Sequence, residues 1–357
     1  MERTVYRIID ANFNRAREGL RVMEEFCRFG LNNRQLSGKA KEIRHRLCDA
    51  IKSIEYERLI ASRDSKADVG SDLVVEGQSE RDSLKECFVA AAKRTTEALR
   101  AMAEAVKIMD AGLAGVLEKL RFEVYTFEKE VVQVSFARKR FENVRLYVII
   151  SVEADDQDEQ VLNMVEKCCA GQADCIQLRC KGVGDLKLLE LAKRFVEICR
   201  SRQVISIIND RADIAVLSGA DGVHAGRDDL PAEQIRKLGT RPLIVGGSTH
   251  SVKELKEAIS TGVDYVGIGP AFKTTTKPGL KAAGLEYIKQ AVKMLEGTGI
   301  GHVAIGGVGL ENVESVINAG AKAAAVCSAI TDAADPEKAT GELKNKISKV
   351  SDQKAKR

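Results

Sequence analysis

The pattern of hydrophobic and polar positions changes once along the chain. Through residues 1–138, apolar residues recur at spacings of three and four among Ala, Leu, Glu, Arg and Lys, which predicts amphipathic helices. From Arg145 onward, short β-branched runs alternate with amphipathic stretches and Gly marks the joins, which is typical of βα units around a parallel sheet. We therefore predict an all-α helical domain over 1–138 and an α/β domain over 144–350. We expect the boundary within 135–143, where the sequence shows no apolar period.

The helical part contains an internal repeat. Residues 15–23 (RAREGLRVM) and 94–102 (RTTEALRAM) carry Arg, Glu, Leu, Arg and Met at the same relative places. We interpret the repeat as two helix pairs related by a pseudo-twofold axis and packed as a bundle. Chance similarity between helices rich in Ala, Glu and Arg is the alternative. Residues 61–70 are polar without an apolar period, so we expect a loop there.

Eight short β-branched or Gly-flanked runs in the second part predict strands, with helical segments between them. The predicted strands are Leu146–Ser151, Cys175–Lys181, Val204–Asn209, Gly222–Ala225, Leu243–Gly247, Tyr265–Gly269, Val303–Gly306 and Ala324–Cys327. The predicted helices include Gln160–Ala170, Leu186–Arg200, Ala232–Leu238, Val252–Ser260, Leu285–Leu295 and Glu311–Ala319. Eight βα units over about 200 residues predict a closed (β/α)8 TIM barrel. An open doubly wound sheet is the alternative, but no G-x-G-x-x-G follows the first strand.

Composition excludes several classes of function. The net charge is only +4, the charges of both signs are interspersed, and there is no Trp, so we expect no nucleic-acid partner. No apolar run approaches the roughly 20 residues of a membrane span, and the start of the chain lacks a signal-peptide core. Nine cysteines without a C-x-x-C pair indicate reduced thiols. We therefore expect a cytoplasmic protein with no membrane partner.

Polar residues at the ends of the predicted strands mark the candidate site, because active sites of such barrels lie there. Strand two ends in QLRCK, residues 177–181. Since side chains alternate between the faces of a strand, Gln177, Arg179 and Lys181 should face the mouth of the barrel. Two cations and an amide suit an anionic ligand. Leu178 and Cys180 should face the helices.

Carboxylates follow the next two strands. Asp210 ends strand three, and Asp228 and Asp229 follow strand four. Asp210 with either of the other two could hold one Mg²⁺, which prefers oxygen ligands and completes its shell with phosphate and water. Asp229 could also cap the helix that begins after Pro231, and a capping role does not exclude a metal role.

Groups suited to phosphate follow the remaining strands. Strand five ends in GGSTH with the Ser248 hydroxyl, and the loop after strand six contains Thr274, Thr275, Thr276 and Lys277, which suggest a phosphate clamp. The ends of strands seven and eight supply glycines and backbone N–H groups, as in the usual barrel phosphate site. Two anion sites and one metal site around one mouth fit two phosphorylated substrates. We expect His224 and His250 to be structural, or to support residues that contact the ligand, rather than catalytic.

Residues 144–332 resemble the thiamine-phosphate synthases. Six motifs in order carry the resemblance: QLRCK at 177–181, INDRADIAVLSGADGVHAGRDDLP at 208–231, GGSTH at 246–250, YVGIGPAFKTTTKPG at 265–279, AIGGV at 304–308 and AVCSAI at 325–330. The resemblance implies a Mg²⁺-dependent transferase that joins a hydroxymethylpyrimidine diphosphate to a thiazole phosphate, giving thiamine phosphate and diphosphate. It implies a dissociative reaction in which diphosphate leaves the pyrimidine methylene carbon before the thiazole nitrogen attacks.

The same resemblance implies roles for individual residues. Asp210 and Asp229 would hold Mg²⁺, and Arg179, Lys181 and Lys277 would stabilise charge on the leaving group. The implied substrate-binding set is Gln177, Leu178, Arg179, Cys180, Lys181, Asn209, Ser248, Thr274, Thr275, Thr276, Lys277, Gly307, Cys327 and Ser328. Cys180 stands where the family usually has an acidic residue, and Cys327 stands at a usually aliphatic position, where we expect contact through the backbone.

Residues 9–21 and 62–70 resemble a helical domain that is fused ahead of some of these synthases and is proposed to be a hydroxymethylpyrimidine-phosphate kinase. The resemblance implies an ATP site, although no G-x-x-x-x-G-K-[ST] loop is present. Its candidate residues are Asn12, Asn14, Arg15, Glu18, Arg21, Arg63, Asp64 and Asp68. A polar helix face with i,i+4 pairs, or a scaffold that forms a homo-oligomer, is the alternative. For the barrel, the alternatives are a thiazole tautomerase and a regulatory barrel that binds thiamine phosphates.

Overall fold

The chain forms two compact units, residues 1–132 and 133–357, each of which is described by itself. The computed structural model describes residues 2–65, 68–69, 80–239, 241–274 and 282–355. One long helix, α5 (Ala111–Phe141), contributes residues to both units and continues through the segment where we expected the boundary. Val134, Ala137 and Phe141 are buried at spacings of three and four, so the apolar period continues.

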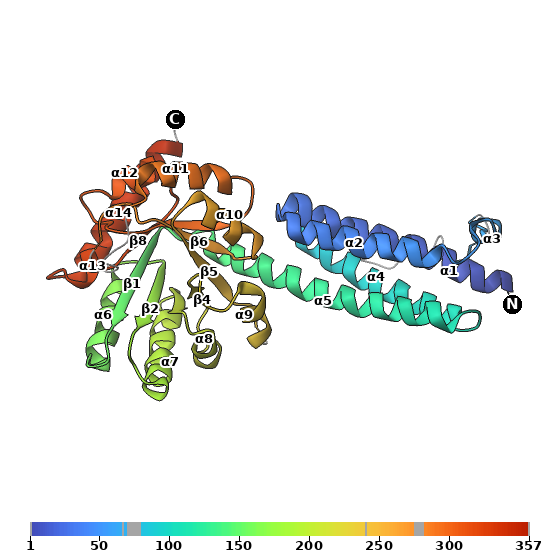
Figure 1. Cartoon of the computed structure of the whole chain (residues 1–357), viewed down its shortest axis with the longest axis horizontal. Coiled ribbons are helices and arrows are strands. Elements are labelled where there is room, and N and C mark those ends of the chain that lie inside the picture. The colour runs from blue at the N-terminus through green and yellow to red at the C-terminus, as the bar shows by residue number, and fades with distance from the viewer. Residues whose placement is uncertain (1, 66–67, 70–79, 240, 275–281, 356–357) are drawn as a thin grey trace. The chain divides into compact units, whose positions relative to one another are not determined.

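The first unit is all helical, as predicted (Figure 1). Its elements are α1 (Glu2–Glu25), the π-helix η1 (Phe26–Gly30), α2 (Arg34–Ile51), α3 (Tyr56–Ser62), α4 (Leu84–Val106) and the first part of α5. The expected loop at 61–70 begins later than predicted, because α3 includes Ala61 and Ser62. Residues 66, 67 and 70 of that loop lie outside the described part of the chain.

The two repeat segments pack against each other in this unit. α1 contacts α4 where Gly19 lies against Thr95, and a Cβ at Gly19 would overlap the Thr95 hydroxyl. Ion pairs of Lys39 with Glu130 (2.9 Å) and of Arg46 with Glu123 (2.6 Å) join α2 to α5 in antiparallel order. Matched helices therefore contact matched helices, as a pseudo-twofold arrangement requires.

The second unit is a closed barrel of eight parallel strands in the order β1 to β8, which confirms the predicted TIM barrel (Figure 1). The strands are β1 (Leu146–Val152), β2 (Cys175–Cys180), β3 (Ile205–Asn209), β4 (Gly222–Ala225), β5 (Ile244–Thr249), β6 (Tyr265–Ile268), β7 (Gly301–Ala304) and β8 (Ala324–Val326). The helices are α6 (Asp158–Ala170), α7 (Asp185–Ser201), α8 (Ala212–Ser218), α9 (Ala232–Leu238), α10 (Val252–Ser260), α11 (Gly284–Leu295), α12 (Val313–Asn318), α13 (Ser328–Thr331) and α14 (Pro336–Ala355).

Three differences from the predicted elements have physical reasons. β5 extends to Thr249, because Ser248 and Thr249 still pair with β6. β7 begins and ends two residues earlier than predicted, since Gly306 has a positive φ of 98° that ends the extended backbone. The helices α8, α13 and α14 were not predicted; α8 and α13 are each too short to show two full apolar periods.

Side chains of each strand alternate between two apolar layers. Val148, Ile150 and Leu178 belong to the layer between the strands and the helices. Tyr147, Ile149 and neighbours from the other strands fill the barrel interior. This alternation is the period-two pattern of a strand buried on both faces.

The end of α5 closes the barrel at the ends where the strands begin. Phe141 stacks on Tyr265 with ring centroids 4.1 Å apart and an angle of 15° between the rings. A Cβ at Gly301 would come within 2.7 Å of the Phe141 ring, so this glycine leaves the space that the ring occupies. Residues 133–141 therefore belong to the barrel unit, and Ala137 and Phe141 are part of its core.

No helix in the described part of the chain is both long enough and apolar enough to cross a membrane.

We predict that Phe141→Ala lowers the free energy of unfolding of the barrel by about 3 kcal/mol, because it removes a buried aromatic ring and leaves a cavity. Phe136→Ala is the matched control, since Phe136 lies on the same helix with 42% exposure against 3% for Phe141. Urea denaturation of the full chain, followed by tyrosine fluorescence, measures both. Equal stability of the two variants would contradict the role of Phe141.

Candidate active site

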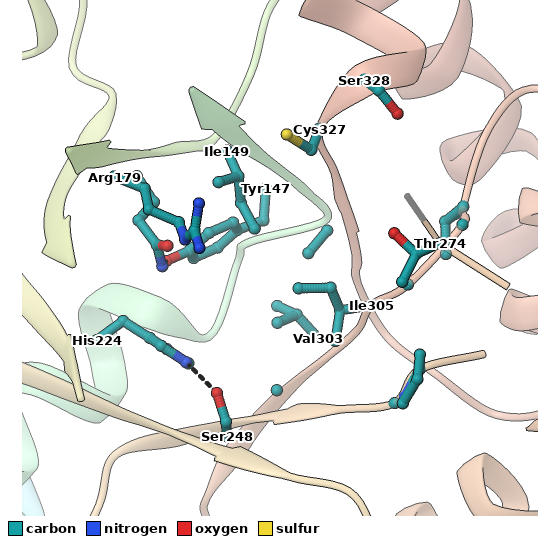
Figure 2. A pocket seen from close by; sticks show the side chains of 18 of the residues that line it. Tyr147, Ile149, Arg179, His224, Ser248, Thr274, Val303, Ile305, Cys327 and Ser328 are labelled. Carbon is teal, nitrogen blue, oxygen red and sulfur yellow. Dashed lines mark hydrogen bonds between the residues drawn. The ribbon is translucent and has the colours of Figure 1, made fainter. Parts of the chain in front are cut away.

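A cavity of about 560 Å³ opens at the carboxyl ends of the barrel strands. Its walls come from every strand of the barrel or from the loop that follows it, and Figure 2 shows side chains from several of them pointing into one space. The floor is apolar and aromatic, with Tyr147, Ile149, Val303 and Ile305. The rim is polar. The cavity therefore lies where the sequence placed the site.

The β2 residues alternate as predicted. Gln177, Arg179 and Lys181 line the cavity, whereas the buried Leu178 and the half-buried Cys180 pack in the layer under the helices. Among the described residues that line the cavity, neither Leu178 nor Cys180 is present. Leu178 and Cys180 thus lie away from the cavity that the other three residues of this run line.

Arg179 is a cation held inside the protein. It is 8% exposed, and its Nη1 donates a hydrogen bond of 3.4 Å to the Ser151 hydroxyl. Within the described ranges of the chain, no carboxylate lies within 4.0 Å of its guanidinium. A buried charge is costly unless an opposite charge compensates it. The pocket therefore favours an anion beside Arg179.

The two predicted metal ligands occupy different positions. Asp210 lines the cavity next to Asn209, and it adopts a positive φ of 60° while its N–H donates to the His224 carbonyl (2.8 Å). The Asp229 carboxylate instead accepts a hydrogen bond of 2.6 Å from the N–H of Gly226. Gly226 lines the cavity, but Asp229 is absent from the lining that the described residues form. Asp229 thus closes the loop after β4 through a residue of the cavity wall.

Five side chains form a continuous series of hydrogen bonds across the cavity floor. Gln177 Nε2 donates to the Tyr147 hydroxyl (2.7 Å), which lies 2.9 Å from the Tyr265 hydroxyl. Tyr265 Oη lies 3.0 Å from His224 Nδ1, and His224 Nε2 lies 2.8 Å from Ser248 Oγ, the contact drawn in Figure 2. Burial raises the pKa of both phenols well above the ordinary value, so both stay protonated.

The loops after β6 and β7 are joined by backbone hydrogen bonds. The N–H groups of Ala271 and Phe272 donate to the carbonyls of Ile305 (2.7 Å) and Gly306 (2.9 Å). Gly306 and Gly307 both have positive φ, and a Cβ on either would overlap the β6 loop. This close approach places Thr274 on the cavity wall. Thr275, Thr276 and Lys277 lie outside the described residues.

The far wall of the cavity comes from β7 and β8. Gly307, Cys327 and Ser328 line it, as predicted for a phosphate-binding region. The Cys327 thiol also lies 3.9 Å from the Ser151 hydroxyl. Backbone N–H groups, small side chains and a hydroxyl suit a phosphate group here.

Sequence reasoning missed the residues of the cavity floor. Tyr147 and Ile149 were predicted only as strand residues, and His224 was expected to be structural or to support a residue that contacts the ligand; all three line the cavity. The sequence held no signal for Tyr147 and Ile149, because their place on the cavity floor depends on the register of the closed barrel, in which Ile149 pairs with Gln177. His250, in contrast, lies at the rim and pairs with Glu254 at 2.9 Å.

A closed barrel with a cavity at its carboxyl rim has the architecture of a (β/α)8-barrel enzyme, with the cavity where such enzymes hold their active sites. Comparisons with known proteins identify the family within this class. The family model described as thiamine monophosphate synthase matches residues 146–330. The chain is 37% identical to a thiamine-phosphate synthase of Nostoc punctiforme over 98% of this chain and 96% of that protein. It is 36% identical to one of Synechocystis over 97% of each.

A solved structure agrees. The thiamine phosphate pyrophosphorylase from Pyrococcus furiosus matches with a TM-score of 0.53 and 32% identity, over 60% of this chain and 98% of that one. The chain belongs to the thiamine-phosphate synthase family. It is accordingly a transferase of thiamine biosynthesis. The model of the ThiD2 family matches residues 7–130, in the helical unit.

Proposed function

We propose that the cavity binds both substrates of the synthase reaction side by side, the pyrimidine diphosphate beside β2, β3 and β5 and the thiazole phosphate beside β7 and β8. The observation that carries this proposal is the buried guanidinium of Arg179, which has no carboxylate partner among the described residues. A diphosphate supplies the missing negative charge. Lys181, Asn209 and Ser248 line the same side and add donors to its oxygens.

The opposite side of the cavity suits the smaller anion. Gly307 and Ser328 offer backbone N–H and hydroxyl groups there, and Thr274 adds a hydroxyl from the β6 loop. The apolar floor between the two sides, with Ile149 and Val303, suits flat aromatic rings. In this proposal the pocket would hold the pyrimidine and the thiazole in contact.

The donor set fits a Mg²⁺ ion. Asp210 lines the cavity, and Mg²⁺ sites commonly use one or two carboxylates together with substrate phosphates and water. We propose Asp210 as the direct ligand and Asp229 as the residue that fixes the neighbouring loop through Gly226. When bound, Mg²⁺ would neutralise charge on the diphosphate oxygens.

The chain's own residues would promote departure of the diphosphate. The C–O bond of the pyrimidine methylene breaks with its electron pair on the diphosphate, and Arg179 and Lys181 stabilise that growing charge. The thiazole nitrogen then forms the new C–N bond with its lone pair. Since this nitrogen carries no proton, no general base is needed. Apolar side chains of the floor, such as Ile149 and Val303, would limit the access of water to the electron-deficient methylene carbon.

We predict that Arg179→Gln lowers kcat/KM for the pyrimidine diphosphate about 100-fold, because a charge-assisted contact worth about 3 kcal/mol is lost. Arg179→Lys should recover part of the loss, since it restores charge without the planar fork. Arg194→Gln is the matched control, because Arg194 lies on the surface of α7 and pairs with Glu159. Steady-state formation of thiamine phosphate measures all three. Equal rates for Arg179→Gln and Arg194→Gln would remove the support for this diphosphate position.

For the helical unit we propose a second activity, the ATP-dependent phosphorylation of the pyrimidine monophosphate. In this step the γ-phosphoryl group of ATP moves to a phosphate oxygen of the monophosphate, and ADP leaves. Its product is the diphosphate that the barrel consumes. The ThiD2 family match and one ionic cluster support the proposal. Asp10, 6% exposed, accepts two hydrogen bonds from the guanidinium of Arg63, at 2.6 and 2.8 Å.

This cluster belongs to the first repeat alone. Offsetting the sequence by the repeat places Val89 opposite Asp10 and Lys93 opposite Asn14. Asn14 donates to the Asp10 carbonyl at 3.0 Å. Arg63 is half exposed, so its remaining donors can meet phosphate oxygens while Asp10 holds it in position. A scaffold formed by duplication does not need this difference between the two repeats, whereas a single nucleotide site does.

We predict that Asp10→Asn lowers ATP-dependent formation of thiamine phosphate from the pyrimidine monophosphate at least about tenfold, since Arg63 loses its charged partner. Formation from the pyrimidine diphosphate without ATP should not change, which controls for folding of the barrel. Asp49→Asn is the matched control, because Asp49 is an exposed carboxylate of the same unit. A wild-type chain that makes product only from the diphosphate would instead favour the scaffold.

A cytoplasmic location and a homo-oligomer stay predictions of the sequence.

A further inference from the structure

The series of hydrogen bonds beneath the cavity has a preferred direction. Each phenol has one proton to donate, and Gln177 Nε2 already donates to the Tyr147 oxygen. Tyr147 and Tyr265 are both fully buried and lie within hydrogen-bonding distance of each other. If Tyr265 donated to Tyr147, the Tyr147 oxygen would accept two bonds and its own proton would have no acceptor among the described residues. A buried donor without an acceptor costs about 1–3 kcal/mol.

The opposite direction satisfies every donor. Gln177 donates to Tyr147, Tyr147 donates to Tyr265, and Tyr265 donates to His224 Nδ1. Because Nδ1 then accepts, the neutral imidazole carries its proton on Nε2. That proton points at Ser248 Oγ, 2.8 Å away. The Ser248 hydroxyl is thereby an acceptor toward His224, and its own proton is left for the cavity.

The backbone around Tyr265 is shaped to keep its hydroxyl in this position. A Cβ on Gly246 would overlap the end of the Tyr265 ring and come within 2.5 Å of its hydroxyl oxygen. Gly247, the next residue of β5, would place a Cβ at an ordinary 3.4 Å from Val263. Phe141 supports the Tyr265 ring from the other side. The ring therefore has a defined place between β5 and the end of α5.

We propose that Tyr147, Tyr265 and His224 are positioning residues that orient the Ser248 hydroxyl as a hydrogen-bond donor to the diphosphate. The inference rests on the proposed position of the diphosphate beside Ser248. It adds a reason for the tyrosines in the barrel core, since phenylalanines would fill the same space. A fixed donor needs no reorientation when charge grows on the leaving oxygen, so the hydrogen bond strengthens as the C–O bond breaks.

Two measurements on the full chain test this proposal. The first is the tautomer of His224 from ¹⁵N–¹H NMR of the imidazole. We expect a single Nε2–H tautomer in the wild type and a mixture of tautomers in Tyr265→Phe, which keeps the ring stacked on Phe141. Tyr287→Phe is the matched control, because Tyr287 donates to Thr249 elsewhere in the barrel (2.8 Å). The control should leave the His224 signals unchanged.

The second measurement is a double-mutant cycle between Tyr265→Phe and Ser248→Ala in kcat/KM for the pyrimidine diphosphate. Each single variant should lose about tenfold, and the double variant should lose no more than Ser248→Ala alone, because Tyr265 acts through Ser248. A purely structural role of Tyr265 would make the two losses multiply, and this result would overturn the proposal.

The outcomes separate this inference from the proposed function beneath it. A wild-type Nδ1–H tautomer would overturn the direction of the series and leave the diphosphate position standing. An Nε2–H tautomer combined with full activity of Ser248→Ala would overturn the assignment of Ser248 to the diphosphate, and with it the role proposed for the tyrosines.

Discussion

The structure depends on one requirement of the barrel's inner face: it must be apolar at one end and polar at the other along the same short strands. The lower layer packs Phe141, Ile205 and Ile244 around the buried rings of Tyr147 and Tyr265. The upper layer holds Arg179 and the polar ends of β3 and β5. Tyr147 and Tyr265 belong to both layers, because their rings pack below while their hydroxyls bond above.

This division explains how the barrel can hold the Arg179 cation inside while no carboxylate of the described residues lies beside it. The apolar lower layer and the helices stabilise the fold, so the rim does not need to be internally neutral. A site that already contained a carboxylate next to Arg179 would have to break that pair before it bound an anion. The uncompensated charge lowers the stability of the free protein, and an anion that binds beside it recovers that free energy. This pattern is common at functional sites.

Much of the barrel could be predicted from the sequence, because its strands are short, β-branched and separated by regular helical periods. The alternation in residues 177–181 was enough to divide Arg179 from Leu178. The floor of the site could not be predicted, since nothing in β1 distinguishes a Tyr that lines a cavity from a Tyr in a core. That distinction depends on which side chains the closed barrel brings together, such as Tyr147 with Tyr265, more than a hundred positions apart in the sequence.

The position of Asp229 and the length of α5 show the same limit. Adjacent strand ends suggested a pair of metal ligands, and the structure adds a hydrogen bond from the Gly226 backbone N–H to the Asp229 carboxylate, which the spacing did not predict. The basic run at 138–140 looked like a linker, yet Phe141 needs the helix to continue so that its ring reaches Tyr265. The local hydrogen bond of Asp229 and the distant contact of Phe141 are both features that residue spacing alone does not predict.

The central claim is that the rim of the barrel receives a diphosphate at the uncompensated charge of Arg179. The most direct measurement is a crystal structure of the full chain with inorganic diphosphate and Mg²⁺. The account predicts diphosphate density inside the cavity, with oxygens within hydrogen-bonding distance of the Arg179 guanidinium and of Ser248 Oγ. Diphosphate bound only outside the cavity, with Arg179 still bonded to Ser151 alone, would contradict it.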